Sequence, residues 1–301
     1  MAYFLGIDGG GTKTRFLLAD QDGIIASASG PGCKVSRVGL EQVRTTLQQG
    51  TNSVCRDVNI SPGDIASVCA GMTGAGREGA ASEIAVVISK LVPSAKIKVV
   101  GDIVIAHEAA LGGAPGVVVI AGTGSIAYGL NEAGETARAG GWGHAISDEG
   151  SGHWIGIKAV AAVLHAHDCG RGTELDPRIL SRWNVRSHDQ LVQLSNASPA
   201  PDFSSLFPDV VAAFENGDPL AQEILVSAGT ELAKVTASVL QRLRFGHPTE
   251  VAMMGGVFLN SEAVRCAFEV ELREQEPDVS ITLSRADPAE GAVAMARRLH
   301  R

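Results

Sequence analysis

The feature that most constrains this chain is a glycine-rich turn close to its N-terminus, set between two strand-like runs. Residues 3–7 form a short apolar run, residues 9–11 are all glycine, and residues 16–18 continue as a second apolar run. Glycine takes backbone angles closed to other residues, so this pattern predicts a sharp hairpin and not the strand-to-helix loop of a dinucleotide-binding motif. Such a turn presents backbone N–H groups, and here the hydroxyls of Thr12 and Thr14, to an anion. An ordinary tight hairpin explains the same residues.

A second copy of this pattern follows about 110 residues later. Residues 117–120 read as a buried strand, residues 121–125 as a glycine turn, and residues 126–130 as the outgoing strand. Two hairpins of the phosphate-binding type predict a duplicated fold with a nucleotide held between the copies. The length of 301 residues is also typical of two domains.

Composition excludes several other classes of protein. The chain is 45% hydrophobic and 19% charged, which is enough for packed cores, and its net charge of −8 with no basic run argues against nucleic acid as a partner. Its apolar runs are shorter than a bilayer requires, and its first residues lack the pattern of a signal peptide. Because the apolar runs are short, we expect no membrane partner. The five cysteines are odd in number and have no C-x-x-C spacing, so we expect a reduced, cytoplasmic protein.

Strand-like and helix-like segments alternate along most of the chain, which predicts an α/β fold. The expected strands are residues 65–70, 97–100 and 249–254, and the expected helices are residues 39–51, 80–91 and 103–111. Residues 112–116 are rich in glycine and contain a proline, so they are the candidate boundary between the halves. We expect one domain to comprise residues 1–111 and 285–301, and the other to comprise residues 112–284.

Asp102 lies where a predicted strand ends and a predicted helix begins. Aspartate is a favoured N-cap, so a purely structural role explains its position. Ligands of open α/β sheets bind at the carboxyl ends of the strands, where a carboxylate can also serve as the general base of a phosphoryl-transfer reaction. Position alone leaves both interpretations open.

The densest polar cluster of the chain is residues 140–156, where glycines alternate with aromatic, acidic and hydroxyl residues. Trp142 offers an apolar plate and Asp148 accepts hydrogen bonds from hydroxyls, a combination that suits a sugar site. The alternative is a loop in which Asp148 and Ser151 only cap the helix that follows. His144 and His153 lack the spacing of a metal site.

The strand predicted at residues 249–254 is followed by Gly255 and Gly256, and Ser261 is a plausible cap for the next helix. A glycine pair after a strand lets a planar base lie against the backbone. In order after the two hairpins, it predicts an adenosine pocket. Residues 287–296 form a small-residue helix suited to close packing.

Taken in order, these motifs resemble the N-acetylglucosamine kinases of the BadF/BadG/BcrA/BcrD ATPase family, within the sugar kinase, heat-shock and actin superfamily. The resemblance rests on residues 8–14, 122–125, 140–144, 148–152 and 254–256 and covers nearly the whole chain. It implies two ribonuclease-H-like (actin-like ATPase) domains with ATP and Mg²⁺ in an interdomain cleft, across which the two hairpins face one another.

The resemblance also implies a role for individual residues. Asp8 is the magnesium-side carboxylate, usually acting through water, and Asp102 is the catalytic base. The residues expected to bind ATP are Gly10, Gly11, Thr12, Lys13, Gly122, Thr123 and Gly124 at the phosphates, with Gly255 and Gly256 at the adenosine. The residues expected to bind the sugar are Cys33, Ser125, Gly141, Trp142 and Asp148.

Two positions depart from the family pattern. Cys33 stands where family members commonly carry an Asn that contacts the sugar, and Ser147 stands where a Gly is common. Ser at that place also occurs in bacterial glucosamine kinases of the family. Both departures lie where the sugar would be bound, so they bear on the identity of the sugar and not on the kinase assignment.

The expected reaction is ATP-dependent phosphorylation of an amino sugar, N-acetylglucosamine to its 6-phosphate, with glucosamine as the alternative acceptor. We also expect a homodimer. Two other classes of protein are alternatives to a sugar kinase. An ATP-driven activator of a dehydratase or reductase would need suitably placed cysteines for an iron–sulfur cluster, and a sugar-sensing regulator would need a DNA-binding appendage.

Overall fold

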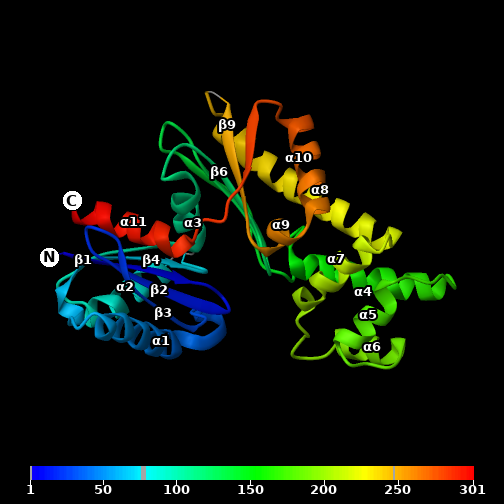
Figure 1. Ribbon diagram of the computed structural model, residues 1–301, viewed down its shortest axis with the longest axis horizontal. Coiled ribbons are helices and arrows are strands. Elements are labelled where there is room, and N and C mark those ends of the chain that lie inside the picture. Colours follow the sequence, from blue (N-terminus) through cyan, green and yellow to red (C-terminus); the bar gives the residue numbers. More distant parts are fainter. Residues whose placement is uncertain (1, 76–78, 247) are drawn as a thin grey trace. The chain divides into compact units, whose positions relative to one another are not determined.

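The computed structural model describes residues 2–75, 79–246 and 248–301. The chain divides into two compact units, whose residues can be followed by the sequence colours in Figure 1. Unit 1 comprises Met1–Ala114 and Arg285–Arg301, so the end of the chain returns to the unit in which it began. Unit 2 comprises Pro115–Ser284.

Unit 1 is built on a five-stranded mixed sheet with the order β3-β2-β1-β4-β5. Its strands are β1 (Tyr3–Gly9), β2 (Lys13–Ala19), β3 (Ile24–Pro31), β4 (Ile65–Met72) and β5 (Lys96–Gly101). The pairs β1–β2 and β2–β3 are antiparallel, whereas β1–β4 and β4–β5 are parallel. The carboxyl ends of β1, β4 and β5 therefore lie at the same edge of the sheet.

Helices cover both faces of this sheet, because its central strands are apolar on both sides. They are α1 (Val35–Asp57), α2 (Ala80–Leu91), α3 (Asp102–Leu111) and α11 (Pro288–His300), and a short 3-10 turn, η1 (Pro62–Asp64), precedes β4. Leu5 and Ile7 of β1 belong to the core on the α1 and α2 side, and Phe4 belongs to a second core with Ile105 of α3 and Met295 of α11. Figure 1 shows α1 and α11 on opposite sides of the sheet.

Unit 2 repeats this strand order. Its sheet, read as β8-β7-β6-β9-β10, corresponds strand by strand to β3-β2-β1-β4-β5 of unit 1. Its strands are β6 (Gly116–Ala121), β7 (Ser125–Leu130), β8 (Thr136–Gly140), β9 (Thr249–Met254) and β10 (Val279–Leu283). Again the first three strands along the chain are antiparallel neighbours, and β6, β9 and β10 are parallel. The predicted α/β class and the predicted duplication are confirmed.

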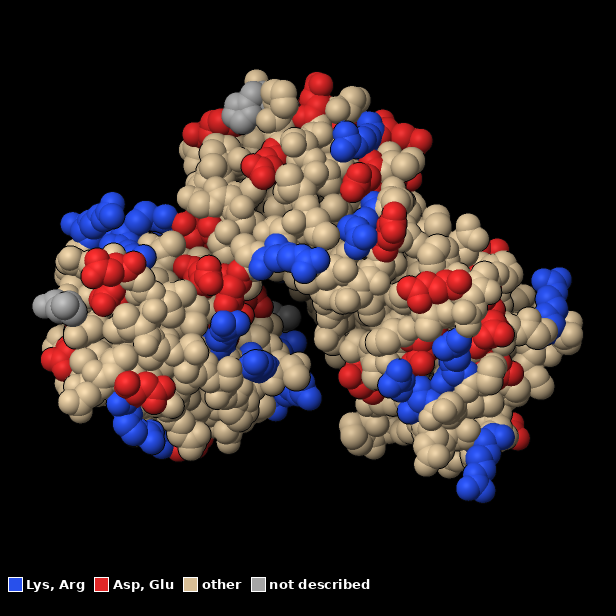
Figure 2. Space-filling model, in the orientation of Figure 1, with Lys and Arg blue, Asp and Glu red and all other residues tan. Residues whose placement is uncertain are grey.

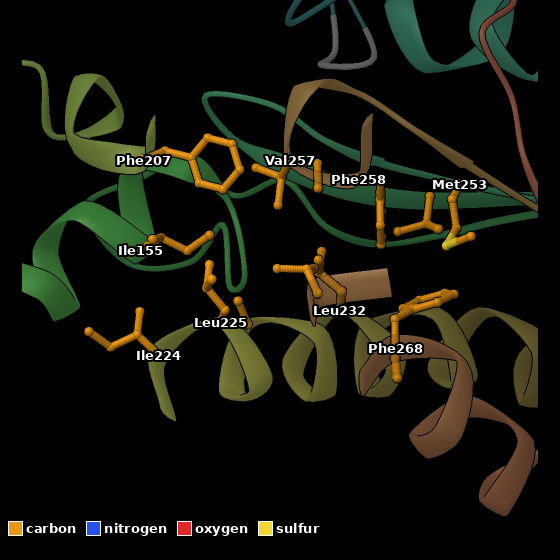
Figure 3. Packing of buried hydrophobic residues seen from close by; sticks show 14 of the residues in the cluster. Ile155, Phe207, Ile224, Leu225, Leu232, Met253, Val257, Phe258 and Phe268 are labelled. Carbon is orange, nitrogen blue, oxygen red and sulfur yellow. The ribbon is translucent and has the colours of Figure 1, made fainter. Parts of the chain in front are cut away.

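The helices of unit 2 pack around one large apolar core. They are α4 (Gly152–Asp168), α5 (Leu175–Arg182), α6 (His188–Ser195), η2 (Phe203–Leu206), α7 (Phe207–Glu215), α8 (Pro219–Leu243), α9 (Gly256–Asn260) and α10 (Glu262–Gln275). Figure 3 shows how Leu225 and Leu232 of α8 meet Ile155 of α4 and the ring of Phe258. Phe258 and Phe268 stack edge to face with ring centroids 5.2 Å apart, which holds α9 and α10 together at the end of β9.

The sequence has a net charge of −8 and no basic run, and the surface has no broad basic area on the face that is drawn in Figure 2. Acidic and basic side chains are interspersed on this face. Within residues 2–75, 79–246 and 248–301, no helix combines the length and the apolar character needed to cross a bilayer.

Several predicted elements match the structure closely. Helix α2 and strand β9 have the predicted limits, and Ser261 caps α10 by accepting a hydrogen bond from the N–H of Val264. Strands β3, β8 and β10, and helices α5 to α9, were not predicted. The helix expected from residue 39 begins earlier, at Val35, and contains a kink at Gly39, whose φ is +77°.

Candidate active site

Three parallel strands bring the acidic residues of unit 1 to one edge of its sheet. The register pairs Gly9 of β1 with Met72 of β4, and Met72 with Gly101 of β5. The residues at these ends, Asp8, Thr73 and Asp102, are consequently neighbours, although they are far apart in the sequence. This edge is where open α/β sheets bind ligands.

Asp8 is a carboxylate of this edge whose pKa is raised. Its pKa is raised to about 6, first by burial and then by the negative charges of Asp102 and Asp287, while the positive charge of Arg15 lowers it in part. Asp287 is the N-cap of α11 and forms an ion pair with Arg15, with an N–O distance of 2.9 Å. Three carboxylates and one guanidinium therefore share this corner of unit 1, an arrangement that disfavours further negative charge and favours a cation.

Asp102 is held by both of its carboxylate oxygens. Oδ1 accepts a hydrogen bond from the N–H of Ile103 at 3.0 Å, and Oδ2 accepts one from the hydroxyl of Thr73 at 2.5 Å. The N-cap position of α3 belongs to Gly101, and Asp102 is the first helical residue. The carboxylate thus satisfies one helix N–H and remains half-exposed, so its contact with the helix does not prevent it from acting as a base.

The first hairpin closes through a hydrogen bond from the N–H of Gly10 to the carbonyl of Lys13 at 3.0 Å. We expected these glycines to supply backbone angles closed to other residues. This expectation is wrong, because none of Gly9, Gly10 and Gly11 has a positive φ. Close approach is the reason at Gly9, where a Cβ would lie 2.4 Å from the sulfur of Met72. Gly32 supports the turn from behind, since a Cβ there would lie 2.3 Å from the Gly11 carbonyl oxygen.

The tip of this hairpin leaves donors available to an anion. Among the described residues, the N–H groups of Gly11 and Thr12 have no backbone acceptor, and the side chains of Thr12 and Lys13 are exposed. The expectation that Thr14 presents its hydroxyl to an anion is wrong. Thr14 is fully buried and donates this hydroxyl to the carbonyl of Pro31 at 2.6 Å, which ties β2 to β3.

The second hairpin has the same construction. The N–H of Gly122 donates to the carbonyl of Gly124 at 2.9 Å, and the N–H groups of Thr123 and Gly124 have no backbone acceptor in the described part of the chain. Helix α4 fixes the turn from one side: the N–H groups of Gly152 and His153 donate to the carbonyls of Gly122 and Thr123 at 2.8 and 3.2 Å.

The loop between β8 and α4 folds onto this hairpin. Ser125 is buried and donates its hydroxyl to the carbonyl of Glu149 at 2.7 Å, and Ser147 donates to Glu149 Oε2 at 3.0 Å. Asp148 is buried with φ +67°, and a Cβ on Gly124 would lie 2.8 Å from its Oδ2. A left-handed backbone at a residue other than glycine is costly, and such residues concentrate at functional sites.

Trp142 lies in the same loop with 57% of its surface exposed. The guanidinium of Arg138 is 4.3 Å from the centroid of its ring, within cation–π distance. The neighbouring Gly141, which directly follows β8, has φ +67°. The rings of His144 and His153 lie 4.6 Å apart, and the pKa of His153 is lowered by burial and by the proximity of His144.

Gly255 requires glycine for two reasons. Its φ is +97°, and a Cβ would lie 2.3 Å from the carbonyl oxygen of Ala121 at the end of β6. Gly256 is the first residue of the short helix α9. In unit 2, the second hairpin, the loop of residues 141–151 and the end of β9 therefore form one contiguous structure.

Cys33 is the site residue whose side chain is least accessible. Its thiol belongs to the core of unit 1 and is fully buried, which raises its pKa, while hydrogen bonding with Thr14 and Thr46 lowers the pKa in part. Its backbone N–H donates to the carbonyl of Gly10 at 3.0 Å. Cys33 thus supports the first hairpin, and its contact with a sugar stays a prediction.

Sequence reasoning missed four residues of this site. They are Thr73, Gly32, Arg15 and Asp287. Thr73 lies just beyond the strand predicted at residues 65–70, and a hydroxyl at the end of a strand is a usable signal. The ion pair of Arg15 with Asp287 joins residues at opposite ends of the chain, and no local pattern reports such a contact.

Comparison with known proteins identifies the class. Residues 5–296 match the BadF/BadG/BcrA/BcrD ATPase family. The chain belongs to this family.

Two curated relatives align over almost their whole length. One is the N-acetylmuramic acid/N-acetylglucosamine kinase of Clostridium acetobutylicum, 35% identical over 99% of both chains. The other is the N-acetyl-D-glucosamine kinase of Dictyostelium discoideum, 28% identical over 97% of both chains. The glucosamine kinase GspK of Vibrio cholerae is 30% identical over 77% of this chain and 78% of its own.

Solved structures share the fold. A Chromobacterium violaceum protein that is 26% identical superposes with a TM-score of 0.79, and the two chains are covered to 100% and 99%. A ROK family glucokinase from Streptomyces griseus has a TM-score of 0.63 with 15% identity, covering 99% of both chains. The second likeness concerns the fold alone.

Proposed function

We propose that this chain is an ATP-dependent amino-sugar kinase that converts N-acetylglucosamine to N-acetylglucosamine 6-phosphate. The observation that carries the proposal is the position of Asp102, whose two oxygens are held at the strand edge beside Asp8 and the first hairpin. A fixed carboxylate next to free backbone N–H groups is what phosphoryl transfer to a hydroxyl requires. The family and its kinase relatives support the same reaction.

In the proposed reaction, Asp102 accepts the proton of the sugar 6-hydroxyl while that oxygen attacks the γ-phosphorus. The new O–P bond forms as the bond from the γ-phosphorus to the bridging oxygen breaks, and ADP leaves with the electron pair. Backbone N–H groups of Gly11 and Thr12 in unit 1, and of Thr123 and Gly124 in unit 2, bind phosphate oxygens. Such preorganised donors stabilise the charge of the transition state.

The chain's own residues fit a magnesium ion on the side of Asp8. Magnesium is usually bound through one or two carboxylates together with phosphate oxygens and water, and not by a cage of protein ligands. Asp8 lies beside Asp102 and Asp287, and the negative charges of these two residues raise its pKa after burial, which is the larger cause. A cation at Asp8 would offset this charge. The ion supplies charge neutralisation at the transferred phosphate.

For the acceptor, we propose that Trp142 and Asp148 bind the sugar ring and its hydroxyls. N-acetylglucosamine is favoured because two of the curated relatives carry it in their names. Glucosamine is the second candidate, favoured by the Glu149 carboxylate that Ser147 orients and by the Vibrio cholerae relative. An ammonium at C2 of the sugar would pair with such a carboxylate, whereas an acetamido group would not.

The test is a comparison of kcat/KM for N-acetylglucosamine, N-acetylmuramic acid, glucosamine and glucose, with ADP release as the readout and mass spectrometry of the product. A buried polar group left unpaired discriminates strongly, so we expect one amino sugar to be preferred over glucose by at least about 100-fold. Equal values for all four sugars, or ATP turnover that no sugar stimulates, would contradict the proposal.

We further propose that the protein acts in the cytoplasm as a homodimer. All five cysteines are free thiols, as in proteins of reducing compartments. Light scattering coupled to size-exclusion chromatography measures the oligomeric state directly, and a monomer at micromolar concentration would contradict the homodimer.

A further inference from the structure

Thr73 connects two parts of the candidate active site that come from different strands. It follows β4 directly, and its N–H donates to the carbonyl of Gly9, where the first hairpin begins, at 2.9 Å. Its hydroxyl donates to Oδ2 of Asp102, which follows β5, at 2.5 Å. One residue therefore links the hairpin through its backbone and the carboxylate through its side chain.

The two hydrogen bonds of Asp102 differ in what they can fix. The bond from Ile103 N–H to Oδ1 comes from the adjacent residue, and by itself it leaves the carboxylate free to pivot about that oxygen. The terminal torsion of aspartate is broad and has only weak preferences. The bond from Thr73 to Oδ2 comes from another strand and removes this freedom.

Orientation is decisive for a general base. A displacement of about 1 Å costs about 100-fold in rate when a reacting group must be aligned. Thr73 is half-buried, and its backbone hydrogen bond prevents it from moving independently of the hairpin. The orientation of the carboxylate is thereby set relative to the backbone that follows Asp8.

We propose that Thr73 is a positioning residue of the phosphoryl-transfer reaction: its hydroxyl holds the Asp102 carboxylate in the orientation that accepts the proton, and its backbone keeps this orientation in register with the first hairpin. The inference rests on the proposed function, since it presupposes that Asp102 is the base. Thr73 itself exchanges no proton with substrate in this role.

The first test replaces the hydroxyl and keeps the shape. Thr73→Val preserves the branched side chain and the N–H to Gly9, so we expect kcat to fall about 10- to 100-fold with little change in KM for ATP or for N-acetylglucosamine. Thr73→Ser restores the hydroxyl and should recover most of kcat. The matched control is Thr236→Val in α8, which removes a buried hydroxyl that donates to the Leu232 carbonyl. Thr236 belongs to unit 2, whereas Thr73 and Asp102 belong to unit 1. This control variant should leave kcat unchanged.

The second test asks whether Thr73 acts through Asp102. Coupled residues give non-additive effects in a double-mutant cycle. In an Asp102→Asn background, measured by transfer of labelled phosphate from ATP to N-acetylglucosamine, Thr73→Val should cause no further loss. If instead it lowers the residual rate by the same factor as in the wild type, Thr73 acts elsewhere and the inference is overturned.

Different results would contradict the role of Asp102 as the base and the role of Thr73 as a positioning residue. If Asp102→Asn keeps full turnover, the proposed base is wrong. If Asp102→Asn is impaired but Thr73→Val keeps the wild-type kcat, or Thr73→Ser is as slow as Thr73→Val, the positioning role is wrong while the proposed function stands. A thermal denaturation curve for each variant separates loss of turnover from loss of the folded state.

Discussion

Replacing Asp8 by asparagine should make the metal-free protein more stable at neutral pH and leave it unchanged in acid. The pKa of Asp8 is raised to about 6, against a reference value of 3.8. The folded state therefore binds the proton more tightly than the unfolded state, and the stability linked to this proton is fully present below about pH 4 and lost as the pH rises through 6. Asparagine cannot ionise, so the variant does not lose it.

The expected magnitude follows from the two pKa values. The difference between 3.8 and about 6 corresponds to about 3 kcal/mol, at about 1.4 kcal/mol per pKa unit. The stability of Asp8→Asn relative to the wild type should consequently grow by about 3 kcal/mol between pH 4 and pH 8. The cause is desolvation first and the charges of Asp102 and Asp287 second.

The assay must report on unit 1. All three tryptophans, Trp142, Trp154 and Trp183, belong to unit 2, so intrinsic fluorescence is the wrong probe. Hydrogen exchange of peptides from β1 and β4, followed by mass spectrometry in buffer with a chelator, measures the opening free energy of the relevant strands. At pH 8 these amides should exchange roughly 100-fold more slowly in the variant, with the intrinsic pH effect corrected.

The matched control is Asp20→Asn. Asp20 lies beyond β2, and hydrogen bonds from the backbone N–H groups of Gly23 and Asp22 lower its pKa. Its stabilising contribution is present above its unfolded pKa and is lost as the pH falls, so its variant should shift stability in the opposite direction. A stability difference for Asp8→Asn that stays flat from pH 4 to pH 8 would refute the electrostatic reasoning. Added MgCl₂ should narrow the difference at pH 8, because a cation offsets the carboxylate.

Three further outcomes are expected. Asp102→Asn should lower kcat by about 100- to 10,000-fold with little change in melting temperature; retained turnover with lost stability would mean that its role is structural. Gly255→Ala should destabilise unit 2 by about 1–3 kcal/mol, because the φ of Gly255 is +97° and the Ala121 carbonyl blocks a Cβ. In Gly11→Ala the new Cβ meets no atom within 4 Å, so this variant should unfold like the wild type but have a raised KM for ATP. Trp142→Ala should raise KM for the sugar about tenfold without affecting KM for ATP, and an unchanged sugar KM would remove Trp142 from the site.

Apolar periodicity and glycines in the sequence predicted the elements whose own residues define them. Helix α2 and strand β9 have strong apolar patterns, and a glycine precedes α2 and follows β9. Strand β3 reads Ile-Ile-Ala-Ser-Ala-Ser-Gly-Pro and is half-exposed at the sheet edge, so its pattern is weak. Strands β8 and β10 are only five residues long, and they owe their existence to pairing with neighbours already in place.

The same limit applies to the site. Both hairpins and Asp102 could be predicted because each is a short motif with its own chemistry. The pairing of Thr73 with Asp102 depends on the register between β4 and β5, and the burial of the Thr14 hydroxyl depends on the register between β2 and β3. Registers are set by the whole sheet, so a residue's partner cannot be inferred from its own segment.

The matching strand order of the two sheets makes corresponding positions directly comparable, and their chemistry has diverged. Where β1 carries Asp8 one residue before its end, β6 carries Ile120, and where β5 is followed by Asp102, β10 is followed by Ser284. The hairpin backbone occurs in both copies, whereas carboxylates at these two positions occur in unit 1 alone. The long helical segment between β8 and β9 occurs in unit 2 alone. Under the proposed function, substitutions in this segment would therefore change the choice of acceptor without altering the carboxylates at the strand ends of unit 1.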